Sequence, residues 1–118
     1  MNKNVKILGT NYKVQTNVPV SKDVRLYDNF GYCAFPEKRI VVVDLNTVDY
    51  LADESESFKI EIMKSTLRHE IIHAFLYESG LYSNSNGPKQ WAMNEEMIDY
   101  FAIQFPKIVE VYKKVGCI

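Results

Sequence analysis

The chain carries its only two histidines in one five-residue motif, His69-Glu70-Ile71-Ile72-His73. Residues four apart lie on the same face of a helix, so both imidazoles can point at a single ion. Glu70 follows the first histidine and is placed to act as a base on a water that the ion holds. The H-E-x-x-H spacing therefore predicts a catalytic zinc site with one Zn²⁺ per chain. The alternative is a pair of buried, hydrogen-bonded histidines on one stripe of an amphipathic helix.

A third metal ligand is expected from the next helix. A catalytic zinc usually has three protein ligands and one open position, and both histidines are already used. Glu95 and Asp99 are four apart and share a helix face, whereas Glu96 points about 100° away. A helical hairpin can bring Glu95 onto the histidine face, with Glu96 as the competitor if that helix is rotated. Asp99 would then reach the far nitrogen of a ligand histidine and fix its tautomer.

The elements that must position these residues begin with short strands. Residues 5–8 and 11–16 flank a turn at Gly9-Thr10, and residues 23–27 alternate polar and apolar side chains. Residues 31–35 lead into a turn at Pro36, before the β-branched segment 39–44. Strands first and helices after predict an α+β fold. In it, a small, mostly antiparallel N-terminal sheet packs on a long H-E-x-x-H helix and a following Glu-bearing helix.

The helix that carries the motif is predicted from about Phe58 to Ser79, with Gly80 as its C-terminal stop. Asp53, with Glu56 in capping-box spacing, is among its candidate N-caps. A second helix over about 89–104 is interrupted by Pro106, and a third over 107–115 ends at Gly116. The expected core-facing stripe of the first helix is Ile60, Met63, Leu67, Ile71 and Ala74. The side chains expected between the helices are Trp91, Met93, Met97 and Phe101.

Length and composition indicate one domain over residues 1–118. Hydrophobic residues make up 47% and charged residues 25%, which is ordinary for a globular protein. A net charge of −1 gives no electrostatic footprint for nucleic acid, and no apolar run suits a signal peptide or a membrane span. Cys33 and Cys117 lack C-x-x-C spacing, so we expect reduced thiols, with a structural disulfide between them as the alternative. Together these features predict a cytoplasmic protein without nucleic-acid or membrane partners.

The two motifs carry a family resemblance. H-E-x-x-H followed by an N-E-x-x-x-D segment at residues 94–99 resembles the gluzincin arrangement of thermolysin-type peptidases. The short length and the continuation Asp99-Tyr100-Phe101-Ala102 more closely resemble the ImmA/IrrE-like metallopeptidases of bacteria, phages and mobile elements, over roughly residues 31–105. Ile98-Asp99 stand in place of that family's Ala-Asn pair. The resemblance implies a minimal zincin-like domain with His69, His73 and Glu95 on zinc, Glu70 as general base and Asp99 behind a ligand.

The expected activity is that of a zinc-dependent endopeptidase acting on one or a few intracellular proteins, with a zinc-bound water activated by Glu70. No third histidine remains to stabilise the oxyanion, so the donor must be a Tyr, an Arg, a backbone N–H or a water, and the candidate side chains are Tyr77, Tyr82 and Arg68. That gap predicts a slow or selective enzyme. The strand 39–44 is expected to form the edge of the cleft and to pair with an extended substrate.

Two other functions compete with this prediction. The chain could be a non-catalytic binding module, a phage or mobile-element protein that keeps a metalloprotease fold and grips a regulatory protein. The presence of Glu70 favours the enzyme, because a binder needs no general base. A zinc site that serves only folding is disfavoured, because such sites close with four protein ligands.

Overall fold

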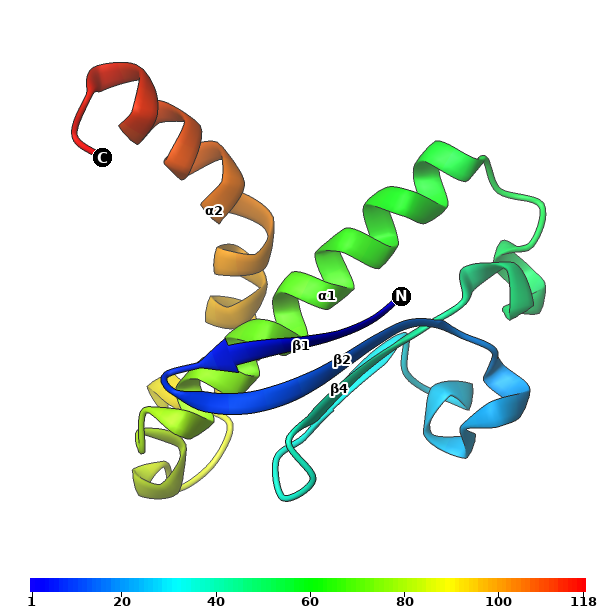
Figure 1. Ribbon diagram of the computed structural model, residues 1–118, viewed down its shortest axis with the longest axis horizontal. Helices are drawn as coiled ribbons and strands as arrows, with labels where there is room; N and C mark the ends of the chain where they lie inside the picture. Colours follow the sequence, from blue (N-terminus) through cyan, green and yellow to red (C-terminus); the bar gives the residue numbers. More distant parts are fainter.

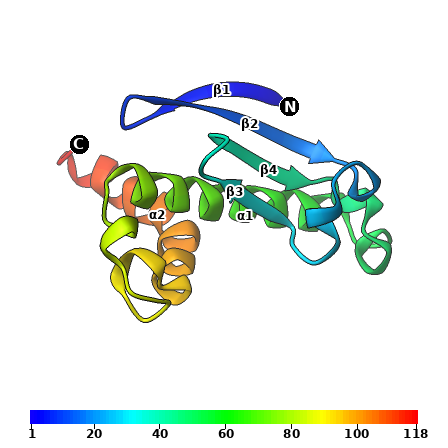
Figure 2. The same ribbon diagram turned by 90° about the horizontal axis from the view of Figure 1, so that it is seen from below.

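The computed structural model describes all 118 residues and has an α+β fold, as predicted. A four-stranded sheet lies as one layer over the long helix α1 (Glu56–Glu78), and helix α2 (Glu95–Val115) packs against α1 (Figures 1 and 2). The C-terminal turns of α2 project away from the rest of the chain (Figure 1). The strands are β1 (Asn2–Ile7), β2 (Thr10–Val18), β3 (Gly31–Ala34) and β4 (Arg39–Val43). Short 3₁₀ turns occupy Val20–Lys22, Val24–Tyr27, Leu45–Thr47, Asp49–Leu51, Tyr82–Asn84 and Trp91–Met93.

The strand order in the sheet is β1-β2-β4-β3. The pairs β1/β2 and β3/β4 are antiparallel, and β2/β4 is parallel. The prediction that residues 39–44 form the edge of the cleft and pair with an extended substrate is therefore wrong, because β4 is already paired on both sides, with β2 and with β3. The run Ile40–Val43 is buried at every position, which is the pattern of a strand covered on both faces. The exposed edge next to α1 belongs to β3.

The predicted strand over 23–27 is a 3₁₀ turn instead. The carboxylate of Asp23 accepts a hydrogen bond from the backbone N–H of Arg25, which starts the turn. Within it, Leu26 enters the core at 2% exposure, and Val24 is 77% exposed. The alternation of polar and apolar residues was a pattern too short to separate a strand from a turn.

Helix α1 sits against the sheet through one face. Ala74 is fully buried, and Met63, Leu67 and Ile71 pack against the core clusters, as predicted. Ile60 is exposed, and the inward position of the first turn is taken by Lys59. Two hydrogen bonds offset the cost of burying the Lys59 ammonium, which donates to Asn46 Oδ1 at 2.6 Å and to the Ala52 carbonyl at 3.2 Å.

The ends of both helices have clear local causes. Ser55, rather than Asp53, caps α1, its hydroxyl accepting a hydrogen bond from the Phe58 N–H at 3.2 Å. Asn94 caps α2 in the same way through the Met97 N–H at 2.8 Å, so the helix starts later than predicted. Gly80 and Gly116 have φ of +83° and +74°, the left-handed conformation that ends helices.

The predicted break of α2 at Pro106 is wrong, since one helix runs from Glu95 to Val115. Pro106 has no N–H for the carbonyl of Ala102, one turn earlier. That carbonyl accepts a hydrogen bond from Nε of Arg68 on α1 instead. A contact from outside the helix thus replaces the bond that proline removes.

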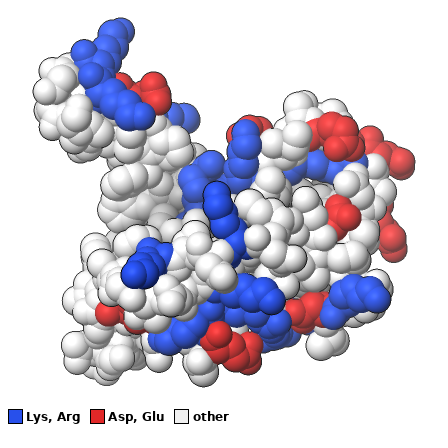
Figure 3. Space-filling model, viewed as in Figure 1, with Lys and Arg blue, Asp and Glu red and all other residues white.

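Charges of the two signs are nearly balanced, with 14 Lys and Arg against 15 Asp and Glu. Basic and acidic side chains are interspersed over the face shown in Figure 3. Neither α1 nor α2 combines the length and the apolar composition that a membrane-spanning helix needs. Both cysteines are free, Cys33 half-buried on β3 and Cys117 exposed after α2.

Candidate metal centre

The crossing of α1 and α2 brings the three predicted metal ligands together. His69 and His73 lie one turn apart on α1, and Glu95 lies in the first turn of α2, at a position fixed by the Asn94 cap. Nε2 of His73 lies 3.0 Å from Nε2 of His69. The Glu95 carboxylate reaches both rings, with Oε2 at 3.1 Å from His69 Nε2 and Oε1 at 3.2 Å from His73 Nε2.

The spacing of these donor atoms suits a small metal ion. Ligand atoms about 2.0–2.1 Å from a tetrahedral zinc lie roughly 3.3 Å from one another. The two histidine Nε2 atoms are 3.0 Å apart, and each lies 3.1–3.2 Å from a different oxygen of the Glu95 carboxylate. Two imidazoles and one carboxylate, without a cysteine, are the donor set of a site that keeps one position open. His69, His73 and Glu95 could therefore hold a metal ion.

Asp99 contacts the other nitrogen of the His69 ring. Its Oδ1 is 2.7 Å from Nδ1 of His69, whereas Nε2 of the same ring faces Glu95 and His73. A hydrogen bond from Nδ1–H to the carboxylate leaves the Nε2 lone pair free to bind a metal. Burial lowers the pKa of His73, despite the opposing charge of Glu95. Glu96 is exposed, and no contact joins it to the histidines.

Glu70 is the one buried carboxylate beside the donors. Its side chain faces β3, and the residue is only 8% exposed. Burial is the main reason that its pKa rises to about 7, with Glu95 adding to the rise and His69 opposing it. A carboxylate with a pKa near neutrality can both take up and release a proton at that pH, which is the requirement for a general base.

A cleft runs between α1 and the edge strand β3, with His69 and Glu70 on its floor. A hollow of about 400 Å³ contains the three donors and Glu70, and its wall includes Tyr32, Cys33 and Phe35. A second hollow of about 230 Å³ lies beside Ser65, Thr66 and Asp99. Both hollows share Asn29, Gly31, His69 and Glu70, so the cleft extends to either side of the base.

Gly31 allows the edge strand to come this close to α1. A Cβ at this position would lie 2.8 Å from Thr66 Cγ2, 3.0 Å from the Val41 carbonyl oxygen and 3.3 Å from Glu70 Cγ. The sequence interpretation left residues 29–35 out of the site. The available signal was a glycine within a strand, which marks a bulge or a close approach by another group.

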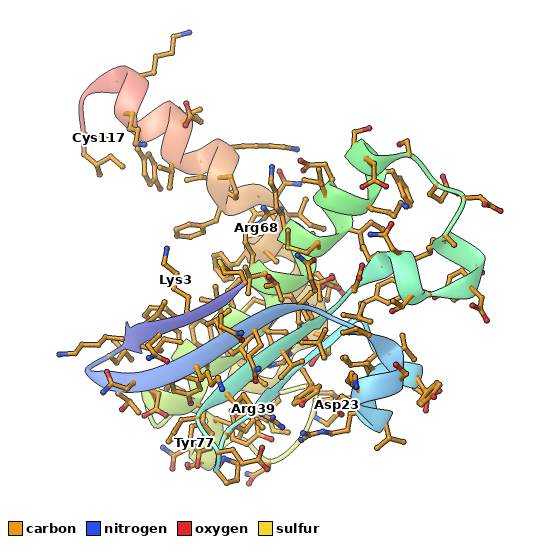
Figure 4. The ribbon with its side chains drawn as sticks, turned by 45° about the vertical axis from the view of Figure 1, so that its right-hand side comes forward. Lys3, Asp23, Arg39, Arg68, Tyr77 and Cys117 are labelled. Atoms are coloured by element: carbon orange, nitrogen blue, oxygen red, sulfur yellow. The ribbon has the colours of Figure 1, made fainter.

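The three oxyanion candidates occupy different places. Tyr82 lines the larger hollow, together with Met93. Tyr77 stacks on Phe35, a wall residue, with ring centroids 4.4 Å apart, and does not itself line the hollow. Arg68 is not part of the cleft, because its side chain turns to the Ala102 carbonyl where α1 meets α2 (Figure 4).

The four apolar residues expected between the helices lie in two different places. Met97 and Phe101 line an apolar groove between α1 and α2, as does Trp91, which is nevertheless 57% exposed. Met93 belongs to the wall of the larger hollow instead.

The site combines two histidines, a carboxylate that contacts both of them, the buried carboxyl group of Glu70 and an open strand edge. Comparisons with protein-family models, with curated proteins and with solved structures give no match for this chain.

Proposed function

We propose that this chain is a zinc-dependent endopeptidase that hydrolyses peptide bonds in one or a few protein substrates. The observation that carries the proposal is the meeting of three donor atoms from His69, His73 and Glu95 next to the buried Glu70. The resemblance to the ImmA/IrrE-like metallopeptidases supports it further. It implies a small sheet, an H-E-x-x-H helix and then a Glu-bearing helix, and the elements follow in this order along the chain.

The chemistry divides between the ion and the side chains. Zinc, when bound, supplies a Lewis acid that polarises the scissile carbonyl and makes a coordinated water more acidic. Glu70 takes the proton from the attacking water and passes it to the amine that leaves. Asp99 keeps His69 in the tautomer that presents Nε2 to the ion.

The open edge of β3 gives an extended peptide a place to bind. β3 pairs only with β4, so its other edge has backbone groups free for a further strand. The same strand forms a wall of both hollows beside Glu70. A peptide lying along β3 would place its backbone between the strand and the base, with side chains reaching into the hollows.

Tyr82 is the residue we assign to the oxyanion. Among the three candidates it alone lines the metal cavity. Its hydroxyl would donate a hydrogen bond to the carbonyl oxygen as negative charge develops there. A Tyr82→Phe variant should keep its metal and lose on the order of a hundredfold in kcat.

The experiment that tests this function starts with metal content. Protein purified without added metal should contain one zinc per chain by elemental analysis, and His69→Ala should contain much less. Glu70→Gln should keep the zinc and lose cleavage, because the amide cannot accept the proton. Substrates are found by comparing cell lysates exposed to wild type and to E70Q, using mass spectrometry of newly formed peptide ends.

Each result has a distinct meaning. Full zinc content in His69→Ala would remove the proposed metal site. Equal cleavage by wild type and E70Q would remove the assigned base. Zinc binding without any new peptide ends in lysate would favour the binding module over the peptidase.

A further inference from the structure

One hydrogen bond ties the two site helices together next to the metal centre. Nε of Arg68 on α1 donates to the carbonyl of Ala102 on α2. Arg68 directly precedes His69, and Ala102 lies one turn beyond Asp99. Figure 4 shows Arg68 where the two helices meet. The bond therefore joins an α1 side chain next to His69 to the backbone of α2, the helix that carries Glu95.

The acceptor of this bond is free because of proline. In a regular helix, the N–H of residue 106 would donate to the carbonyl of residue 102. Pro106 has no N–H, and yet α2 continues through it to Val115. The Ala102 residue is 1% exposed, so its carbonyl has little access to water and needs a donor. Arg68 supplies one, and its positive charge makes the bond stronger than one from a neutral donor.

The other contacts between the helices do not fix their relative setting as firmly. Ile98 and Ala102 are buried on the inner face of α2, but apolar packing has no preferred direction. The side chains of Glu95 and Asp99 are 59% and 60% exposed, and exposed ion pairs contribute little. The Arg68 bond is directional and joins a side chain to the backbone itself.

We propose that Arg68 is a positioning residue for the metal centre. Its hydrogen bond to the carbonyl that Pro106 leaves free sets α2 on α1 so that Glu95 and Asp99 meet the histidines. Arg68 and Pro106 then act as a pair: the proline creates the acceptor, and the arginine uses it. This inference rests on the proposed metal site.

The test measures zinc affinity by competition with a chromophoric chelator, using the full chain. Arg68→Met keeps an unbranched side chain of similar reach and removes the donor. Lys64→Met is the matched control, since Lys64 lies one turn earlier on α1 and pairs only with Glu61. Pro106→Ala restores a backbone N–H to the Ala102 carbonyl, and R68M/P106A completes the cycle. Arg68→Lys retains a charged donor.

We expect R68M to lower zinc affinity about tenfold, in the range found for groups that orient metal ligands. K64M should change it less than about twofold, and R68K should fall between R68M and wild type. In the P106A background the same Arg68→Met change should cost less than about threefold, because the restored N–H takes over the carbonyl. Urea unfolding of each zinc-free variant separates positioning from general stability.

The outcomes are distinguishable. Zinc binding by wild type with R68M equal to K64M would overturn the positioning role and leave the proposed function standing. If Arg68→Met lowers zinc affinity equally in the wild-type and P106A backgrounds, the pairing of Arg68 with Pro106 is overturned. If R68M has a lower urea midpoint but unchanged zinc affinity, Arg68 has a structural role only. If R68M does not fold, R68M/P106A should fold and bind zinc like P106A, and its failure to do so would also overturn the inference. A wild type that binds no zinc would remove the proposed function itself.

Discussion

The carboxylate of Asp99 lies 2.7 Å from Nδ1 of His69, while Nε2 of the same ring lies 3.1 Å from Glu95. Two carboxylates one turn apart on α2 thus contact the two nitrogens of one imidazole. The ring is held between them, with Nδ1 engaged and Nε2 turned toward His73. With an ion on Nε2, the contact with Asp99 would hold the ring proton on Nδ1.

Removing the carboxylate of Asp99 should weaken metal binding. We expect Asp99→Ala to lower zinc affinity about ten- to a hundredfold, because His69 loses the partner that fixes its tautomer and ring orientation. Glu96→Ala removes a neighbouring exposed carboxylate that does not contact the histidines and should leave the affinity near that of wild type. Chelator competition measures both variants, and equal affinities would show that the Asp99 contact has no role in metal binding.

Adding one methyl group at Gly31 should destabilise the fold. The new Cβ would lie 2.8 Å from Thr66 Cγ2 and 3.0 Å from the Val41 carbonyl oxygen. We expect Gly31→Ala to lower the free energy of unfolding by about 1–3 kcal/mol, as overpacking does. Thr66→Ser removes the Cγ2 methyl. The decrease in the free energy of unfolding of the G31A/T66S variant should therefore be smaller than the sum of the decreases in the two single variants. Urea unfolding tests this, and an unaltered midpoint for G31A would mean that the strand can move away freely.

Stability should fall in acid partly through Glu78. Its carboxylate accepts hydrogen bonds from Lys38, Tyr12 and Thr10, and the bonds from Lys38 and then Tyr12 are the main causes of a pKa below the ordinary 4.5. A lowered pKa in the folded state means that the ionised group stabilises the fold above about pH 4.5. This contribution is lost as the pH falls through the lower, folded-state value.

Glu78→Gln should therefore reduce the acid sensitivity of the fold. At pH 7 we expect a loss of about 1 kcal/mol in the free energy of unfolding. Between pH 7 and pH 3 the stability of the variant should decrease less than that of wild type. Glu54→Gln, at an exposed carboxylate without side-chain partners, is the control and should follow the wild-type curve. Parallel curves for E78Q and wild type in urea unfolding would exclude the Glu78 contribution.

The two thiols should differ in reactivity. Burial, together with the negative charge of Glu70, raises the pKa of the Cys33 thiol to about 12, and Cys117 is exposed. Because the thiolate is the reactive form, iodoacetamide at pH 8 should alkylate Cys117 at least about tenfold faster than Cys33. Peptide mass spectrometry gives both rates, and in urea the two should converge. Equal rates in the folded chain would contradict the burial of Cys33.

The helical part of the candidate site was predictable because its geometry is local. Helix periodicity alone puts His69 and His73 on one face of the first helix, and Glu95 and Asp99 on one face of the second helix. Only the crossing of the two helices had to be assumed, and the loop between them allowed it. The stripe residues Met63 to Ala74 followed from the same periodicity.

The sheet was less predictable because its pairing joins distant segments. The composition of β4 indicates a buried strand, but no local signal tells which strands flank it. The place of β3 at the edge depends on the parallel pairing of β2 with β4, which the sequence pattern does not encode. The donor to the Ala102 carbonyl, which Pro106 leaves without its helical partner, is likewise distant in sequence, since Arg68 lies 34 residues away on the other helix.

The donor atoms and the cleft wall come from separate stretches of the chain. The three candidate donors and Asp99 all lie between His69 and Asp99 in the sequence, and the wall opposite Glu70 is formed by residues 29–35. Changes in the short strand segment can therefore reshape the cavity while the donors keep their places. In the proposed peptidase, substrate selectivity and metal affinity would then be two traits that can evolve one at a time.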